Sequence, residues 1–249
     1  MKIMDADCHI TPTHYTAEEL IRDMDKTGTD RALIWINPHV GQPDELNPYI
    51  YESSKRYSDR LMGFGWANPR MGVSAAREQV VRCLEEYGFP GVKLNGAQND
   101  FYIDDPQLSL PVIEEIAKRG KIVAFHTGAD AFDKTHPFRV GKIAAMYPEI
   151  PFLMIHMGGA AEPNLGDAAI EVAATHKNIY LVASAIAPKP ILKAVKTLSA
   201  DRVMYGSDSP FGLMRVELAK AKALLEEEFS DDKLNGFFYG TASRLFDGN

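Results

Sequence analysis

The sequence predicts a (β/α)8 barrel, because eight strand-like apolar runs alternate with eight segments whose apolar residues recur at helical spacing. With 249 residues and 45% apolar content, the chain is long enough to bury such a core. No shift in composition divides it in two. We therefore expect one domain over residues 1–249, with an additional C-terminal helix around residues 233–246.

The expected strands are short apolar runs, and several of them end in polar residues. They cover residues 2–10, 31–37, 61–69, 91–96, 121–128, 152–159, 179–185 and 203–210. In the first strand, Asp5, Asp7 and His9 fall on one face at a spacing of two, and Met4, Ala6 and Cys8 fall on the other. His126 stands at the end of one face of the strand at 121–128, and His156 stands at the end of one face of the strand at 152–159.

The expected helices lie between these strands and carry ordinary end signals. They cover residues 16–28, 45–58, 73–88, 108–120, 138–148, 166–177, 190–199 and 216–229, of which the segment at 45–58 is the weakest. Thr16 with Glu19 is typical of a capping box, and Gly28, Gly88 and Gly120 stand where left-handed helix caps occur. An open doubly wound sheet is the alternative fold. It usually has a glycine-rich phosphate loop after its first strand, and residues 10–16 contain no glycine.

Charge and cysteine content limit the classes of partner. The net charge of −7 disfavours nucleic acid, since basic contacts drive that binding, and indicates a small-molecule substrate. Cys8 and Cys83 are too few for a disulfide framework, and Cys8 is interpreted as a small core residue. No apolar run has transmembrane length and the chain opens on a strand, so we expect a cytoplasmic protein that does not enter membranes. Whether it forms a homo-oligomer is left open.

Ionisable side chains stand at the ends of four expected strands. They are Asp7 and His9, His126, His156, and Asp208. The carboxyl ends of all strands meet at one rim of a barrel, so these residues are expected to converge there. Buried carboxylates and imidazoles need partners, and one divalent cation would satisfy them together.

The segments DADCHI, HTG, HMGG and GSDSPF, in this order and spacing, resemble the metal-dependent hydrolases of the amidohydrolase superfamily. The resemblance is strongest to the compact amidohydrolase-related group that includes amino-carboxymuconate-semialdehyde decarboxylase, and it covers essentially the whole chain. The C-terminal FFYGTASRLFD is similar to the closing helix of that group. One departure stands at the first strand, where the family pattern is His-x-His and this chain has Asp7 before His9.

The resemblance implies a metal site made by Asp7, His9, His126 and Asp208. It also implies that Asp208 takes a proton from metal-bound water, and that His156 is an acid/base group or a ligand of a second ion. We expect one ion rather than two, with zinc first and manganese second. Lys93 ends the fourth strand where two-metal members carry a carbamylated lysine. For this chain, a lysine that shapes the pocket is the preferred interpretation.

Further pocket candidates follow other expected strand ends, although each of them taken singly is more often an ordinary loop residue. They are Trp66, Asn68, Asn95, His136 and Arg139.

The leading function is metal-dependent hydrolysis of an amide, ester or lactone of a small carboxylated molecule. The alternative is metal-dependent non-oxidative decarboxylation of a small or aromatic acid. A metal-free lactonase and a catalytically inactive binding module are further hypotheses. The substrate itself is not predicted, because loop conformation determines specificity.

Overall fold

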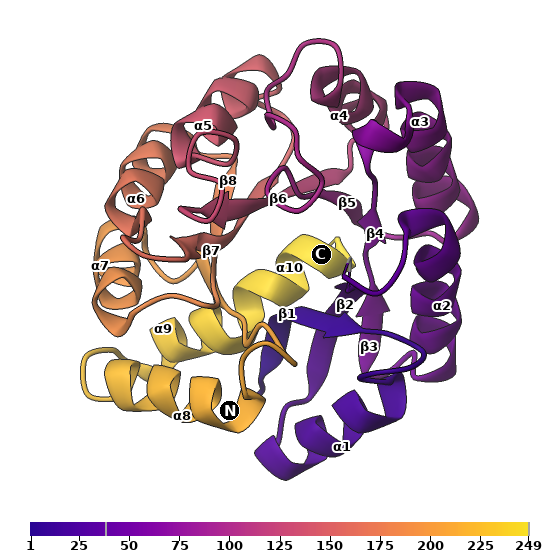
Figure 1. Cartoon of the computed structure of the whole chain (residues 1–249). Helices are drawn as coiled ribbons and strands as arrows, with labels where there is room; N and C mark the ends of the chain where they lie inside the picture. Colours follow the sequence, from indigo (N-terminus) through magenta and orange to yellow (C-terminus); the bar gives the residue numbers. More distant parts are fainter. Residues whose placement is uncertain (38, 249) are drawn as a thin grey trace.

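The computed structural model describes residues 1–37 and 39–248, in which parallel strands form a ring with helices around it (Figure 1). The strands are β1 (Met4–Ile10), β2 (Arg31–Ile36), β3 (Leu61–Gly63), β4 (Gly65–Trp66), β5 (Gly91–Leu94), β6 (Ile122–Gly128), β7 (Phe152–Ala160), β8 (Ile179–Ala183) and β9 (Val203–Tyr205). The surrounding helices are α1 (Ala17–Thr27), α2 (Pro43–Arg56), α3 (Val73–Val81), α4 (Ser109–Ala117), α5 (Pro137–Met146), α6 (Gly166–Thr175), α7 (Pro188–Leu198) and α8 (Met214–Leu225). Short turns η1 (Pro69–Met71) and η2 (Arg82–Glu86) flank α3.

The strands pair in two runs, β1-β2-β3 and β4-β5-β6-β7-β8-β9, and backbone contacts join these runs on both sides. Between β3 and β4, the Phe64 amide donates to the Ile34 carbonyl at 2.9 Å, which continues the pairing with β2. Between β9 and β1, Cys8 pairs in parallel with Ser209, and the His9 amide donates to the Ser209 carbonyl at 2.6 Å. The predicted barrel is therefore confirmed.

Three expected elements differ from prediction. The strand expected at 61–69 is two short strands interrupted at Phe64, and the strand expected at 203–210 ends at Tyr205, so Asp208 lies in the following loop. The pairing of β1 with β2 shifts by one residue between Asp5 and Cys8, which breaks the strict alternation expected there. By contrast, the Thr16–Glu19 capping box and the left-handed glycine caps are present as predicted.

The additional C-terminal helix is a continuous helical segment with a π-helical turn in it. It consists of α9 (Asp231–Asn235), η3 (Gly236–Gly240) and α10 (Thr241–Asp247), and Figure 1 shows α10 crossing the middle of the ring. The Phe246 ring lies 6.3 Å from the Phe64 ring, and Asp247 accepts two hydrogen bonds from the Arg31 guanidinium at the first residue of β2. The segment thus covers the amino end of the barrel, which leaves the carboxyl end for a site.

In the described residues, no helix combines the length and apolar character needed to cross a membrane.

Close strand packing depends on glycine at the start of β5. A Cβ atom at Gly91 would lie 2.3 Å from the Ile122 carbonyl oxygen and 2.4 Å from the Phe64 ring. Gly91→Ala should therefore lower the free energy of unfolding by about 1–3 kcal/mol, measured by urea titration. Gly240→Ala is the control, since its nearest contact is an ordinary 3.4 Å. Equal stability of the two variants would contradict this account.

Candidate metal centre

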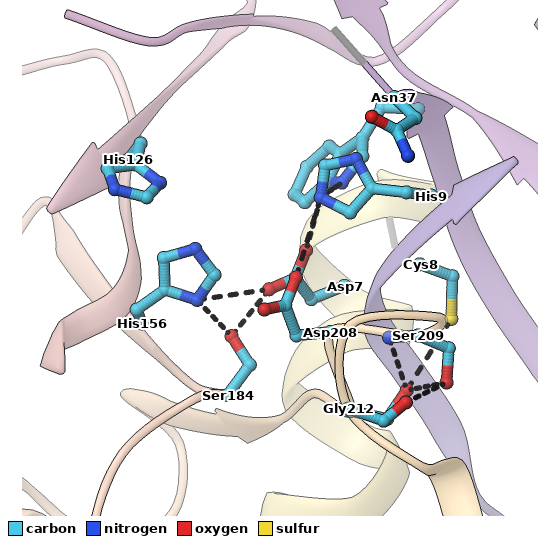
Figure 2. A network of polar contacts seen from close by, with 12 residues as sticks. Asp7, Cys8, His9, Asn37, His126, His156, Ser184, Asp208, Ser209 and Gly212 are labelled. Atoms are coloured by element: carbon cyan, nitrogen blue, oxygen red, sulfur yellow. Dashed lines mark hydrogen bonds and ion pairs between the residues drawn. The ribbon is translucent and has the colours of Figure 1, made fainter. Parts of the chain in front are cut away.

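Three predicted ligands converge where β1 and the loop after β9 meet (Figure 2). Asp7, His9 and Asp208 each offer one ligand atom, and these atoms all lie within 4.8 Å of one another. The His9 Nε2 atom is 3.6 Å from the Asp7 Oδ1 atom and 3.6 Å from the Asp208 Oδ1 atom. All three side chains are buried or nearly so, which suits a site that excludes bulk water.

His9 is held in the form that binds metals. Its Nδ1 atom lies 2.6 Å from the Ile36 carbonyl oxygen, which can only accept, so Nδ1 carries the proton and Nε2 keeps its lone pair. Burial, followed by the charge of Lys93, lowers the pKa of His9 well below its usual value and keeps the ring neutral. The Trp35 indole donates to the same Nε2 at 3.0 Å, so a bound ion would take over this lone pair.

The two carboxylates share a low-dielectric setting. Burial raises the pKa of Asp7, and burial together with the nearby Asp7 charge raises the pKa of Asp208 to about 9. Within the described residues, the Asp7 Oδ1 atom is buried without a hydrogen-bond partner. Two adjacent buried carboxylates are costly to ionise without a cation, and one imidazole with two carboxylates is a suitable donor set for a divalent ion.

Lys93 is a second unusual feature of this interior. Its Nζ atom is fully buried, has no hydrogen-bond partner in the described residues, and lies 4.0 Å from the Asp7 Oδ1 atom. The same atom lies 3.9 Å from the centre of the Trp35 ring and 5.0 Å from that of Trp66, so aromatic faces surround it. Burial lowers the pKa of Lys93, whereas Asp7 acts in the opposite direction. The structure thus places a lysine against the predicted ligand Asp7.

His156 and Ser184 lie on the other side of Asp7. The Ser184 hydroxyl donates to the Asp7 Oδ2 atom at 2.5 Å and lies 2.9 Å from the His156 Nδ1 atom. His156 and Asp208 both have positive φ, at 66° and 57°. Non-glycine residues in this region are strained and often lie at functional sites, and the acid/base roles of these two residues stay predictions.

His126, the fourth predicted ligand, lies apart from the three-residue group (Figure 2). It lies near the carboxyl end of β6, and its ring centre is 4.8 Å from that of His156. Its Nε2 atom lies 2.8 Å from the Oδ2 atom of Asp130. The structure therefore brings His126 to the same rim but pairs it with a carboxylate.

The predicted pocket residues are divided between the site and local structure. Trp66 is buried with its ring centre 6.1 Å from that of His9. Asn68 caps η1 by accepting from the Arg70 amide, and Asn95 accepts from the amides of Ala97 and Gln98. His136 caps α5, and Arg139 pairs with Asp104 at 2.6 Å. These last two residues line a separate depression together with Asp104, Phe132, Asp133, Phe138 and Lys142.

Three residues that contact the site were not singled out from the sequence. Trp35 is the penultimate residue of β2 and donates to His9, and Asp130 follows the HTG segment and pairs with His126. Phe211 follows GSDSP, is 53% exposed, and presents its ring edge-on to His9 with 5.3 Å between ring centres. The only sequence signal was their position just at or after strand ends.

The chain belongs to the amidohydrolase family, whose model matches residues 4–248. This membership supports an enzymatic role for the site. A 2-amino-3-carboxymuconate-6-semialdehyde decarboxylase of Dictyostelium discoideum is 29% identical over 92 residues, which are 37% of this chain and 22% of the relative. The chain thus matches about a fifth of the length of that curated relative.

Solved structures share the fold over nearly the full length. A 2,6-dihydroxybenzoate decarboxylase from Rhizobium has a TM-score of 0.77 at 17% identity, covering 99% of both chains. A dihydroxybenzoic acid decarboxylase from Polaromonas, with bound manganese and the inhibitor 2-nitroresorcinol, has a TM-score of 0.74 at 18% identity, covering 99% of this chain and 97% of the other. An uncharacterised barrel protein from Bordetella bronchiseptica has a TM-score of 0.80 at 18% identity, covering 98% of both chains.

The buried acids predict how stability depends on pH. Burial raises the pKa of Asp5 to about 7, and that of Asp208 is raised to about 9, from a usual 3.8. Their contribution to stability is therefore complete below pH 4 and is lost as the pH rises through about 7 and about 9. Calorimetry in a chelator should show a melting temperature that falls between pH 7 and pH 9, because below pH 7 the lowered pKa values of His9 and His156 act in the opposite direction.

Asp5→Asn should gain stability relative to wild type between pH 5 and pH 7, because an amide does not ionise while its oxygen still accepts from the Ser207 amide, as Asp5 does at 2.9 Å. Added Mn²⁺ should raise the melting temperature most at high pH, where the carboxylates are free to bind it. A melting temperature that rises steadily from pH 5 to pH 9 in chelator would contradict these raised pKa values.

Proposed function

We propose that this protein is a metal-dependent non-oxidative decarboxylase of a small planar carboxylic acid. The observation that carries the proposal is the buried group Asp7, His9 and Asp208, with His156 held beside it through Ser184. This arrangement pairs a cation site with an acid/base side chain, as decarboxylation requires. The names of the Dictyostelium relative and of the Rhizobium and Polaromonas neighbours support this reaction over the hydrolysis expected first from the sequence.

The proposed ion is manganese, with zinc as the alternative. Carboxylate oxygens suit manganese, and Asp7 contributes one where the family pattern has a histidine. The manganese in the Polaromonas neighbour is consistent with this choice. We also retain His126 as a ligand, as the family resemblance implies; it would exchange its contact with Asp130 for the ion.

The chain's own side chains would carry the remaining chemistry. When bound, the ion would supply Lewis-acid polarisation of the substrate's oxygen atoms. The bond between the carboxylate and the carbon that carries it then breaks, and carbon dioxide leaves. The electron pair of the broken bond stays on the carbon that carried the carboxylate. His156 takes up a proton from solvent and delivers it to this carbon. Burial lowers the pKa of His156 well below its usual value, so a proton held there is readily given up.

Aromatic side chains favour a planar substrate. The half-exposed Phe211 ring stands beside His9 and lies 5.9 Å from the His39 ring, and Trp66 lies on another side of His9. Rings of this kind stack on flat, conjugated molecules. A conjugated acid is also what decarboxylation needs, because its π system accepts the electron pair released from the broken bond.

Hydrolysis by a metal-activated water is the second candidate, favoured by the description of the family as amidohydrolases. It uses the same four proposed ligands, with Asp208 as the group that takes the proton of the water. The products distinguish the two reactions, since decarboxylation releases carbon dioxide and hydrolysis creates a new carboxyl, amine or alcohol.

Metal content tests the ligand assignment. The protein purified with Mn²⁺ should hold about one ion per chain by mass spectrometry of the metal. His9→Ala and His126→Ala should each weaken binding about tenfold or more, because each removes a proposed ligand. Asp130→Asn should not weaken it, since Asp130 only pairs with His126. A ratio near two would overturn the single-ion proposal, and full affinity in His126→Ala would remove His126 from the ligand set.

Activity tests the reaction. The Mn²⁺-loaded protein should release carbon dioxide from some of a panel of hydroxybenzoates, and Asp208→Asn should reduce kcat by about 100-fold or more while the fold is kept. Asp167→Asn is the matched control, because that carboxylate is 80% exposed on α6. Hydrolysis of lactones or amides without carbon dioxide release would favour the second candidate.

A further inference from the structure

The two oxygen atoms of Asp7 face different partners. The Oδ1 atom faces His9 at 3.6 Å and Lys93 at 4.0 Å, and it has no hydrogen-bond partner in the described residues. The Oδ2 atom accepts the Ser184 hydroxyl and lies 3.5 Å from the Nδ1 atom of His156. One oxygen is thus available to a cation, and the other is linked to the proposed acid/base residue.

We propose that Ser184 is a positioning residue that joins Asp7 to His156 and fixes the proton of His156 on Nδ1, so that Nε2, on the side away from Ser184 and Asp7, is left without a proton. The catalytic consequence rests on the proposed function, but the hydrogen-bond arrangement does not. The structure assigns Ser184 two partners on two other strands of the barrel, Asp7 on β1 and His156 on β7.

The proton count follows from the chemistry of the three groups. Asp7 would be ionised when it holds the proposed cation, and an ionised carboxylate only accepts, so the single hydroxyl proton of Ser184 goes to Asp7. The Ser184 oxygen then has only lone pairs for His156, 2.9 Å away, and the Nδ1 atom must donate to it. A neutral imidazole with its proton on Nδ1 has a bare Nε2. Figure 2 shows that second nitrogen directed away from Ser184 and Asp7.

Packing confines the hydroxyl to this position. Ser184 is fully buried just beyond β8, and Gly206 lies against it. A Cβ atom at Gly206 would be 3.2 Å from the Ser184 Cβ atom and 3.0 Å from the Asp7 Cβ atom. The glycine thus allows the serine and aspartate side chains to approach each other, and Figure 2 shows the hydroxyl between Asp7 and His156.

This arrangement also gives a physical role to the aspartate that replaces the family's first histidine. When Nε2 takes up a proton, the imidazolium donates through Ser184 to a carboxylate, which stabilises the charge. A neutral histidine in place of Asp7 would lack that negative charge. The Ser184 link therefore couples the proposed ligand Asp7 to the acid/base residue.

Ser184→Thr and Ser184→Val test the link as a matched pair, because both add bulk of the same shape and only Thr keeps the hydroxyl. The first readout is ¹⁵N–¹H NMR of histidine-labelled, Zn²⁺-loaded protein, with His156 assigned by its loss in His156→Gln. Wild type and Ser184→Thr should show His156 protonated on Nδ1. Ser184→Val should show a mixture or the Nε2 form, whereas a side chain that only fills space would leave the tautomer unchanged.

The second readout is kinetic. In the Mn²⁺-loaded enzyme, Ser184→Val should lower kcat about 10- to 100-fold with KM changed less than about threefold, and Ser184→Thr should restore most of it. If packing prevents both larger variants from folding, Ser184→Ala takes the place of the valine variant. An Nδ1-protonated His156 in every hydroxyl-free variant, or an Nε2-protonated His156 in wild type, would overturn the proposal. Absence of decarboxylation in wild type, with the NMR result as expected, would instead overturn only the proposed function.

Discussion

The burial of two carboxylates side by side, Asp7 and Asp208, is the constraint on which the rest of the site depends. Burial raises the pKa of both, and the charge of Asp7 raises that of Asp208 further. Lys93 brings one positive charge to Asp7 but makes no hydrogen bond in the described residues. The neutral His9 ring adds a lone pair rather than a charge. A divalent cation is the partner that this combination of groups fits best.

The contact between β1 and the loop after β9, which closes the barrel, brings these groups together. Cys8 pairs with Ser209, so the end of β1 lies against the loop that carries Asp208. Asp5 stabilises this contact, because its Oδ1 atom accepts hydrogen bonds from the backbone amides of both Asp7 and Ser207. The register shift after Asp5 and the positive φ of Asp208 adjust where the side chains point. Strain at such positions is tolerated because the surrounding barrel is rigid and well packed.

Much of this organisation was accessible from the sequence, because periodicity and strand-end chemistry are local signals. The eight strand–helix pairs, the capping box at Thr16 and the convergence of Asp7, His9 and Asp208 follow from them. The break at Phe64 was not accessible, since it lies next to Gly63, which packs against the Phe89 ring from another part of the chain. The pairing of His126 with Asp130 and of His156 with Ser184 was not predicted either. Asp130 lies in an irregular loop, and Ser184 is 28 residues from His156 in the sequence, so no local pattern relates the partners.

The sequence by itself determined which chemical groups stand at the strand ends and that a barrel would gather them at one rim. This is so because alternation of apolar and polar residues is a property of each strand alone. Only the tertiary structure decided which atoms meet. One oxygen of Asp7 accepts from Ser184, and the other is available to a cation. His126 pairs with Asp130, and Lys93 is buried beside two indole rings. Those outcomes depend on distances of a few ångströms between separate strands, which are set by register and packing rather than by local pattern.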